Sequence, residues 1–217
     1  MKPELAVLGG SFDPPHIGHV FLATYARSVA GVVRVLVAPT FEHAFGKPLS
    51  AFEHRMRMCE LAFSLIDGVE VSPIERELGG VSRTLRLVQE LARRFPDHQL
   101  RLLVGADILL ETQRWLRFDD IIALAPLLVA ERAGFASTGD SSLARAGTAP
   151  PLDPGAPVLP QVSSSEIRRA LSEFFSLART ATAPLDQPSA SSALSSWLPR
   201  QVHAYIVQHG LYAPSEP

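Results

Sequence analysis

The residues between positions 5 and 19 constrain the fold more than any other part of the chain. Residues 5–8, LAVL, form a short apolar run with the length of a buried strand. Gly9 and Gly10 follow at once, and glycine lets the backbone turn sharply and approach a ligand closely. Ile17 then begins a run whose apolar spacing suits a helix. The chain therefore contains a strand, a glycine turn and a helix in immediate succession.

His16 and His19 lie at the predicted start of this helix. Backbone N–H groups and the helix dipole favour a phosphate at such a position. Histidines three residues apart share one face of the first turn, so both can reach one anion, and Gly18 removes a side chain where a phosphate needs room. The alternatives are a simple turn at the glycines and a histidine that only caps the helix. The dinucleotide fingerprint G-x-G-x-x-G and the P-loop pattern do not match here.

Strand-like and helix-like segments alternate along the chain. The expected strands lie near residues 4–8, 32–38, 69–71, 100–104 and 127–130, and the expected helices near 17–29, 52–66 and 84–95. Strands that alternate with helices of about 10–15 residues predict an α/β fold, with a parallel sheet and helices on both faces. Such sheets bind ligands beyond the carboxyl ends of their strands. The loops that follow residues 8, 39 and 104 should therefore form one composite site.

Composition excludes several classes of protein. The 217 residues suit a single domain, and 20 Lys and Arg against 22 Asp and Glu leave a net charge of −2, which argues against a nucleic-acid partner. The single cysteine, Cys59, excludes an internal disulfide and suits a reducing compartment, and we expect it to be buried. No run approaches the ~20 apolar residues of a membrane helix, and the first residues carry no signal-peptide pattern. We expect a cytoplasmic protein with no membrane partner.

The segment GGSFDPPHIGH, residues 9–19, resembles the ATP-binding signature of the nucleotidyltransferases that carry an H-x-G-H motif. Within that superfamily it is most similar to the bacterial nicotinate mononucleotide adenylyltransferases. The resemblance implies a Rossmann-like nucleotidyltransferase domain with a C-terminal helical segment. It also implies that His16 and His19 bind the ATP phosphates and stabilise the charge of the transition state. The remaining ATP-binding residues that it implies are Gly9, Gly10, Ser11, Phe12 and Gly18.

A second segment, VSSSEIRR at residues 162–169, also reads as the start of a helix. Ser163 or Ser164 can serve as the N-cap, with Glu166 completing a capping box. The simpler interpretation is only a capped helix. The segment also resembles the family's I-S-S-T-x-I-R motif, which implies that Ser163 and Ser164 hold phosphates. It also implies that Arg168 pairs with the phosphates and joins His16 and His19 in catalysis by neutralising charge on the leaving oxygens. A guanidinium fork suits phosphate oxygens.

The mononucleotide site rests on shorter motifs. Gly105-Ala106-Asp107 follows a predicted strand, and together with Trp115 it resembles the family's G-A-D…W pattern. The resemblance implies substrate contacts at Gly105 and Asp107 and stacking of a pyridine ring on Trp115. Asp107 as a helix cap and Trp115 as a core residue are the alternatives.

Two further segments depart from the family pattern. The loop at residues 40–50 lacks the usual P-P-H-K-like sequence, and its Lys47 could meet a phosphate while Phe41 or Phe45 stacks on a ring; a plain surface loop is the alternative. The segment at residues 79–85 matches at Thr84 and Leu85, and Thr84 is carried over as a mononucleotide contact. Substrate identity is therefore less well defined by the sequence than reaction type.

We interpret residues 1–217 as a single domain. Residues 133–160 are rich in Gly, Ala, Ser, Thr and Pro and predict a long loop, and residues 175–196 predict a flexible insertion. The segment from Leu198 to Tyr212 resembles the family's closing helix, with Gly210 as its stop signal. Oligomeric state leaves no signal in the sequence.

The resemblance implies an adenylyltransferase that joins nicotinate or nicotinamide mononucleotide to the α-phosphate of ATP and releases pyrophosphate, in NAD biosynthesis. ATP and nicotinate mononucleotide are the implied partners, and Mg²⁺ would be bound mainly by the ATP phosphates rather than by a protein metal site. The alternatives are transfer to another phosphate acceptor such as phosphopantetheine, the use of CTP, and a nucleotide-sensing module without turnover.

Overall fold

Five parallel strands form the sheet of the computed structural model, which describes residues 2–105, 115–130, 162–180, 194 and 196–214. The strands are β1 (Glu4–Gly10), β2 (Arg34–Pro39), β3 (Val69–Val71), β4 (Gln99–Gly105) and β5 (Leu127–Ala130), in the spatial order β3-β2-β1-β4-β5. Every adjacent pair is parallel. Because β1 is central and its neighbours are β2 and β4, the chain builds one side of the sheet before it crosses to the other.

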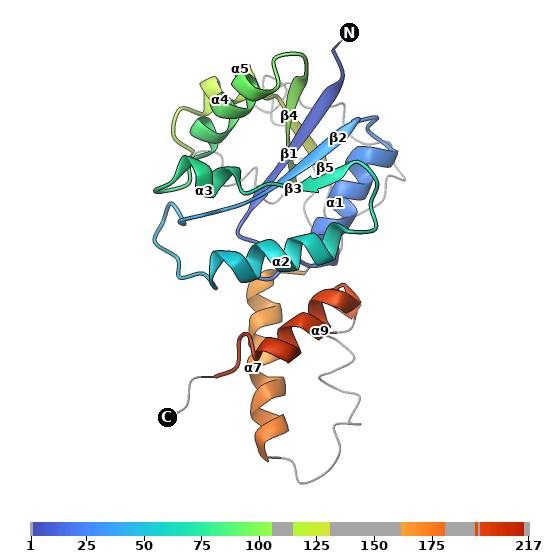
Figure 1. The fold of residues 1–217 in the computed structure, drawn as a ribbon, viewed down its shortest axis with the longest axis vertical. Coiled ribbons are helices and arrows are strands. Elements are labelled where there is room, and N and C mark those ends of the chain that lie inside the picture. Colours follow the sequence, from blue (N-terminus) through green and yellow to red (C-terminus); the bar gives the residue numbers. More distant parts are fainter. Residues whose placement is uncertain (1, 106–114, 131–161, 181–193, 195, 215–217) are drawn as a thin grey trace, which may run out of the picture.

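The central strand is buried on both faces, which explains its continuous apolar run. Successive side chains of a strand point to opposite faces, and accordingly Ala6 and Leu8 belong to one core cluster while Leu5 and Val7 belong to the other. The first cluster is covered by α1 (Ile17–Ser28), α2 (Phe52–Phe63), α7 (Ser164–Thr180) and α9 (Arg200–His209). The second is covered by α3 (Ile74–Leu78), α4 (Thr84–Arg94) and α5 (Phe118–Leu124) (Figure 1). The predicted α/β fold with helices on both faces is confirmed.

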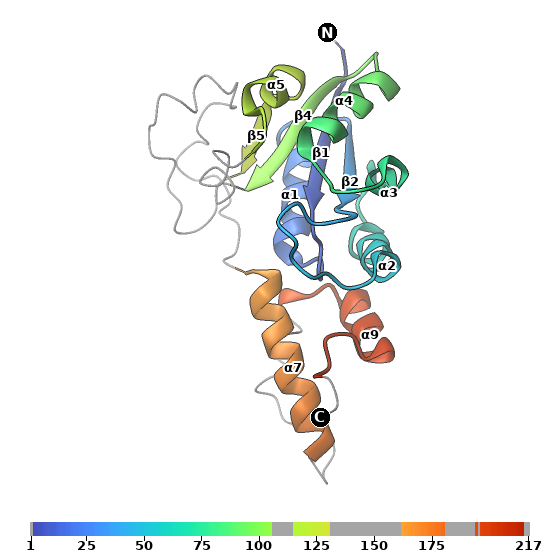
Figure 2. The ribbon, with the colours of Figure 1, turned by 90° about the vertical axis from the view of Figure 1, so that its left-hand side faces the viewer.

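The carboxyl ends of the strands face the start of α7. In Figure 2 the arrowheads of β1 and β4 point toward the end of the sheet from which α7 and α9 extend. The rings of Phe174 on α7 and His203 on α9 are 6.4 Å apart, so these two helices touch. The C-terminal helical segment is thus attached to the edge of the sheet at which ligands bind in folds of this class.

Most predicted elements occur within two residues of their expected bounds, and two differences in the helices have physical causes. Helix α2 ends at Phe63 instead of residue 66, because Leu65 is 90% exposed and contributes nothing to the apolar face that suggested a longer helix. Helix α3 was not predicted, because five residues are too few to show a helical period. Cys59 is buried, as expected.

The predicted start of the flexible insertion at residue 175 is wrong. Helix α7 continues to Thr180, and Phe174 and Phe175 pack against the core cluster. The averaged composition of the segment concealed this last apolar turn of the helix. Residues 181–193 and the long loop predicted at 133–160 lie outside the described residues. Helix α9 ends at the predicted Gly210. None of the helices in the described ranges has both the length and the apolar character needed to cross a bilayer.

The turn between α2 and β3 supports a stability prediction. Gly68 lies in this turn, and Gly31, between α1 and β2, serves as a comparison. Both residues have φ of +73°, a backbone conformation that disfavours any side chain. A Cβ at Gly31 would meet nothing within 4 Å, whereas one at Gly68 would lie 2.5 Å from the guanidinium of Arg27, which donates to the carbonyls of Asp67 and Val32 at 2.8 and 2.6 Å.

We expect Gly31→Ala to lower the free energy of unfolding by about 1–2 kcal/mol, the cost of a left-handed backbone. Gly68→Ala should lower it by a further ~1–3 kcal/mol, since Arg27 must also give up its two hydrogen bonds. Urea unfolding of both variants measures the difference. Equal losses would show that Arg27 does not anchor this turn.

Candidate active site

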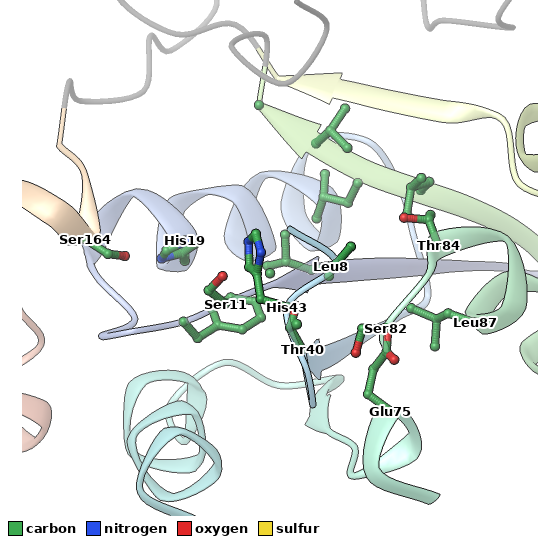
Figure 3. A pocket seen from close by; sticks show the side chains of 18 of the residues that line it. Leu8, Ser11, His19, Thr40, His43, Glu75, Ser82, Thr84, Leu87 and Ser164 are labelled. Carbon is green, nitrogen blue, oxygen red and sulfur yellow. The ribbon is translucent and has the colours of Figure 1, made fainter. Parts of the chain in front are cut away.

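A cavity of about 730 Å³ opens at the carboxyl edge of the sheet. Its volume lies within the range of small-molecule sites. Figure 3 shows His19 and Ser164 on one side of the cavity and Ser82, Thr84 and Glu75 on the other. The predicted site residues that line it are Gly9, Gly10, Ser11, Phe12, His16, Gly18, His19, Lys47, Thr84, Gly105, Trp115, Ser163 and Ser164. Arg168 does not line the cavity, and Asp107 lies outside the described residues.

The two histidines stack on each other at the start of α1. Their ring centroids are 3.8 Å apart, and the backbone N–H of His16 donates to Nδ1 of His19 at 3.1 Å. Because Nδ1 of His19 accepts this bond, the proton of a neutral ring is on Nε2, which leaves Nε2 as a donor. The ring of Phe12 supports His19 from a centroid distance of 4.9 Å. The local packing therefore fixes both the orientation and the tautomer of His19.

The room that Gly18 leaves is taken up largely by His16. A Cβ at position 18 would lie 3.1 Å from two atoms of the His16 ring and 3.5 Å from Val162. From the sequence alone, this space is expected to accommodate a phosphate. In the structure a side chain at position 18 would first press on the His16 imidazole, so the glycine protects the placement of the histidine pair.

The start of α7 has the predicted capping box. The N–H of Glu166 donates to Oγ of Ser163 at 3.2 Å, and the N–H of Ser163 donates to the Glu166 carboxylate at 3.0 Å. Ser164 instead donates its hydroxyl to the carbonyl of Pro14 at 2.9 Å. The guanidinium of Arg168 donates to the carbonyl of Asp13 at 2.6 Å and to the hydroxyl of Ser165 at 3.1 Å. Helix α7 is thus bound to the loop that precedes the histidines.

Sequence reasoning missed a buried arginine beneath this loop. Arg55 is 1% exposed and donates to the carbonyls of Ser11, Thr40 and Ser50 at 3.0, 2.6 and 2.9 Å. Its burial lowers the pKa of the guanidinium, while the nearby negative charge of Asp13 acts in the opposite direction. One side chain therefore joins the loops that follow β1 and β2.

A signal for this arginine was present in the sequence. Arg55 follows Phe52 by three residues and precedes Cys59 by four, so it lies on the apolar face of α2. A charged residue on a buried helix face needs hydrogen-bond partners. That requirement could have identified Arg55, from the sequence alone, as a residue that holds neighbouring segments together.

The described residues predicted for the mononucleotide also line the cavity, and Thr84 lies on the side opposite His19 and Ser164 (Figure 3). Thr84 is the first residue of α4, and Lys47 is exposed on the loop after β2. Phe45 of that loop lines the cavity and is 66% exposed, whereas Phe41 packs edge-on against Phe52 at 5.4 Å. Of the two aromatic residues considered for ring stacking, Phe45 faces the cavity and Phe41 supports the base of its own loop.

Trp115 combines the two interpretations that the sequence left open. It lines the cavity, and it also packs edge-on against Phe118 at a centroid distance of 6.1 Å, at the margin of the second core cluster. Trp115 is therefore held by the core while part of it borders the space available to a ligand.

Glu75 is the one carboxylate among the described residues that line the cavity. It is 6% exposed, and its burial raises the pKa of the carboxyl, while a hydrogen bond with Ser82 and the charge of Arg86 oppose that rise. Ser82 in turn accepts the backbone N–H of Phe41 at 2.9 Å. Glu75 belongs to the unpredicted helix α3 and was missed with it.

Comparison with known proteins identifies the family. Residues 7–170 match the family model described as cytidylyltransferase-like. The "Probable nicotinate-nucleotide adenylyltransferase" of Anaeromyxobacter sp. (strain K) is 39% identical over 212 residues, which cover 96% of each chain. The protein of the same name from Myxococcus xanthus (strain DK1622) is 33% identical over 215 residues, which cover 98% of this chain and 97% of the relative. This chain belongs to the nicotinate-nucleotide adenylyltransferase family.

Solved structures agree with this family in fold. The Plasmodium falciparum nicotinic acid mononucleotide adenylyltransferase complexed with NaAD superposes with a TM-score of 0.74 over 97% of each chain, at 16% identity. The same enzyme complexed with APC superposes with a TM-score of 0.72 over 98% of each chain. At this level of identity the comparison establishes the shared architecture. The family resemblance that the H-x-G-H segment carried is confirmed.

Arg55 should stabilise this adenylyltransferase fold far more than its exposed neighbour Arg57. Arg55→Met should lower the free energy of unfolding by about 3–5 kcal/mol, because buried carbonyls, each worth ~1–3 kcal/mol, lose their donor. Arg57→Met removes only a surface ion pair with Glu60 and should cost less than about 1 kcal/mol. Urea unfolding of both variants measures the difference, and similar losses would contradict the role assigned to the buried guanidinium.

Proposed function

We propose that this chain transfers the adenylyl group of ATP to the phosphate of nicotinate mononucleotide. The observation that carries the proposal is the meeting of two helix starts in one cavity. His16 and His19 at the start of α1 and Ser164 at the start of α7 line it together with Lys47 and Trp115. A helix start suits phosphate, and a cavity of about 730 Å³ leaves room for a second substrate. Relatives over nearly the full length of the chain are named for this reaction.

The reaction needs no nucleophile from the protein. A phosphate oxygen of the mononucleotide attacks the α-phosphorus of ATP and forms the new P–O bond, while the bond from that phosphorus to the bridging oxygen breaks and pyrophosphate leaves. Catalysis then consists of holding the two reactants in line and stabilising the charge that develops on the leaving oxygens. In the proposal Nε2 of His19, already set as a donor by the contact with His16, supplies part of that stabilisation.

Arg168 has a more indirect position than its motif suggested. Its described contacts, to Asp13 and Ser165, use two of its five N–H donors. We propose that its remaining N–H donors bind a phosphate at the start of α7. Asp107 is retained as a mononucleotide contact on the strength of the family resemblance.

Mg²⁺ belongs to the proposal as part of the ATP substrate. In the described ranges no three His, Cys, Asp or Glu side chains are grouped so that they could hold a metal ion, and Glu75 is the one described carboxylate in the cavity. This donor set does not form a protein cage for Mg²⁺, an ion that is usually bound through substrate phosphates and water. The ion supplies neutralisation of phosphate charge when it enters with ATP.

Pyrophosphate release, measured with a panel of acceptors, tests the proposal. Nicotinate mononucleotide, nicotinamide mononucleotide and phosphopantetheine are each incubated with the protein and with ATP or CTP. We expect the fastest turnover with nicotinate mononucleotide and ATP. Faster turnover with phosphopantetheine or with CTP would identify a different transferase, and ATP binding without any turnover would indicate a nucleotide sensor.

His19→Asn tests the role of the imidazole. The asparagine oxygen lies near the place of Nδ1 and can still accept the N–H of His16, but Nε2 is lost. Loss of one transition-state donor should lower kcat by about 10²–10³. His98→Asn is the control, since His98 packs against Phe95 near the opposite edge of the sheet and should leave kcat unchanged. Near-normal turnover of His19→Asn would remove His19 from the mechanism.

A further inference from the structure

The segment that follows α9, here called the C-terminal tail, is hydrogen-bonded to the loop between β1 and α1, here called the histidine loop. The residue that accepts this bond lies close to the histidines. The hydroxyl of Tyr212 donates to Oδ1 of Asp13 at 2.7 Å, and the N–H of Ser50 donates to Oδ2 at 3.3 Å. Asp13 is 2% exposed. Burial and the negative charge of Asp13 raise the pKa of Tyr212, so its hydroxyl keeps its proton and remains the donor. A hydrogen bond to a buried carboxylate is of the stronger, charge-assisted kind.

The same short stretch of loop also receives α7. The carbonyl of Asp13 accepts the Arg168 guanidinium, and the next carbonyl, that of Pro14, accepts the Ser164 hydroxyl. Two consecutive residues thus carry contacts from the tail that follows α9 and from the start of α7. His16 follows after only one more residue, Pro15, and proline restricts the backbone. A displacement of Asp13 should therefore be transmitted to the histidine pair.

Residues with strained backbone conformations lie at both ends of the Tyr212–Asp13 hydrogen bond. Tyr212 has φ of 67° and Phe12, next to Asp13, has φ of 48°, a left-handed region that costs most residues about 1–2 kcal/mol. Such conformations persist only where surrounding contacts hold them. On the tail side, Leu211 donates its N–H to the carbonyl of Ile206, which is fully buried in α9. The tail is therefore tied to a buried residue of α9.

We propose that Tyr212 is a positioning residue for the transferase reaction: its hydroxyl holds the Asp13 carboxylate and so keeps the histidines of α1 and Arg168 of α7 aligned. This inference rests on the proposed function for its kinetic consequence. The chain brings the two residues together across 199 positions of sequence. Tyr212 touches neither substrate in this scheme and acts only through the loop.

A matched pair of tyrosine variants tests the proposal. Tyr212→Phe removes the hydroxyl that holds Asp13. Tyr205→Phe removes a hydroxyl on α9 that contacts Nδ1 of His54 at 2.9 Å, away from the loop. Both variants should lower the melting temperature, Tyr212→Phe by more, because its hydroxyl is bonded to a buried carboxylate. Only Tyr212→Phe should lower kcat, by about tenfold or more, with smaller changes in KM, because small misplacements of reacting groups reduce rates by up to about a hundredfold.

A double variant shows whether Tyr212 acts through Asp13. Once Asp13→Ala has removed the carboxylate, adding Tyr212→Phe should lower kcat by less than about twofold more. A full additional tenfold loss would contradict the proposed route. If Asp13→Ala does not fold, the comparison of the two tyrosine variants still decides the question.

NMR spectra of the histidine side chains report on the conformation of the loop in the absence of substrate. In long-range ¹H–¹⁵N NMR spectra, Tyr212→Phe should shift the His16 and His19 imidazole signals, and Tyr205→Phe should leave them in place. Absence of turnover by the wild-type chain with nicotinate mononucleotide would refute the proposed function, while the spectra would still test the link. Active wild type, with kcat and histidine signals of Tyr212→Phe equal to those of Tyr205→Phe, would refute the positioning role alone.

Discussion

The geometry of the cavity depends on a single buried guanidinium. The loops after β1 and β2 both direct part-buried carbonyl groups toward Arg55, and a carbonyl left there without a donor would be costly. Arg55 supplies donors to carbonyls of both loops at once. The positive charge also faces the buried carboxylate of Asp13, to which the C-terminal tail is bound. The histidine loop is therefore a tertiary structure rather than a local turn, since it takes its shape from α2, α7 and the tail.

The fold could be predicted because its signals are local. A strand buried on both faces shows as an unbroken apolar run, and helices of ten or more residues show their period. Helix α3, with five residues, lies below that limit, and the last turn of α7 was concealed by averaging Phe175 with its small and polar neighbours. Helices and strands could thus be predicted wherever the apolar repeat was long enough to recognise.

The site could be predicted only in part, for a related reason. His16, His19 and Ser164 belong to contiguous motifs, and the structure brings them to one cavity. Tyr212 was missed because its partner Asp13 lies 199 positions away in sequence, and Glu75 was missed because helix α3 is too short to show a period. Arg55 was missed although it lies on the apolar face of α2. A short motif also does not show whether a residue makes structural contacts, borders the cavity or does both. The hydroxyl of Ser163 caps a helix and yet borders the cavity, and Trp115 is both core and lining.

The strand order has a consequence for how such a site can change. Residues that follow β1 and the start of α7 line the cavity, and so do residues of the loop after β2, the start of α4 and the end of β4. These segments are separate along the chain and share one sheet. Under the proposed function, substitutions at Lys47, Thr84 or Trp115 would alter which acceptor is admitted while His16 and His19 stay in place. Acceptor choice would then vary separately from the binding of the nucleoside triphosphate.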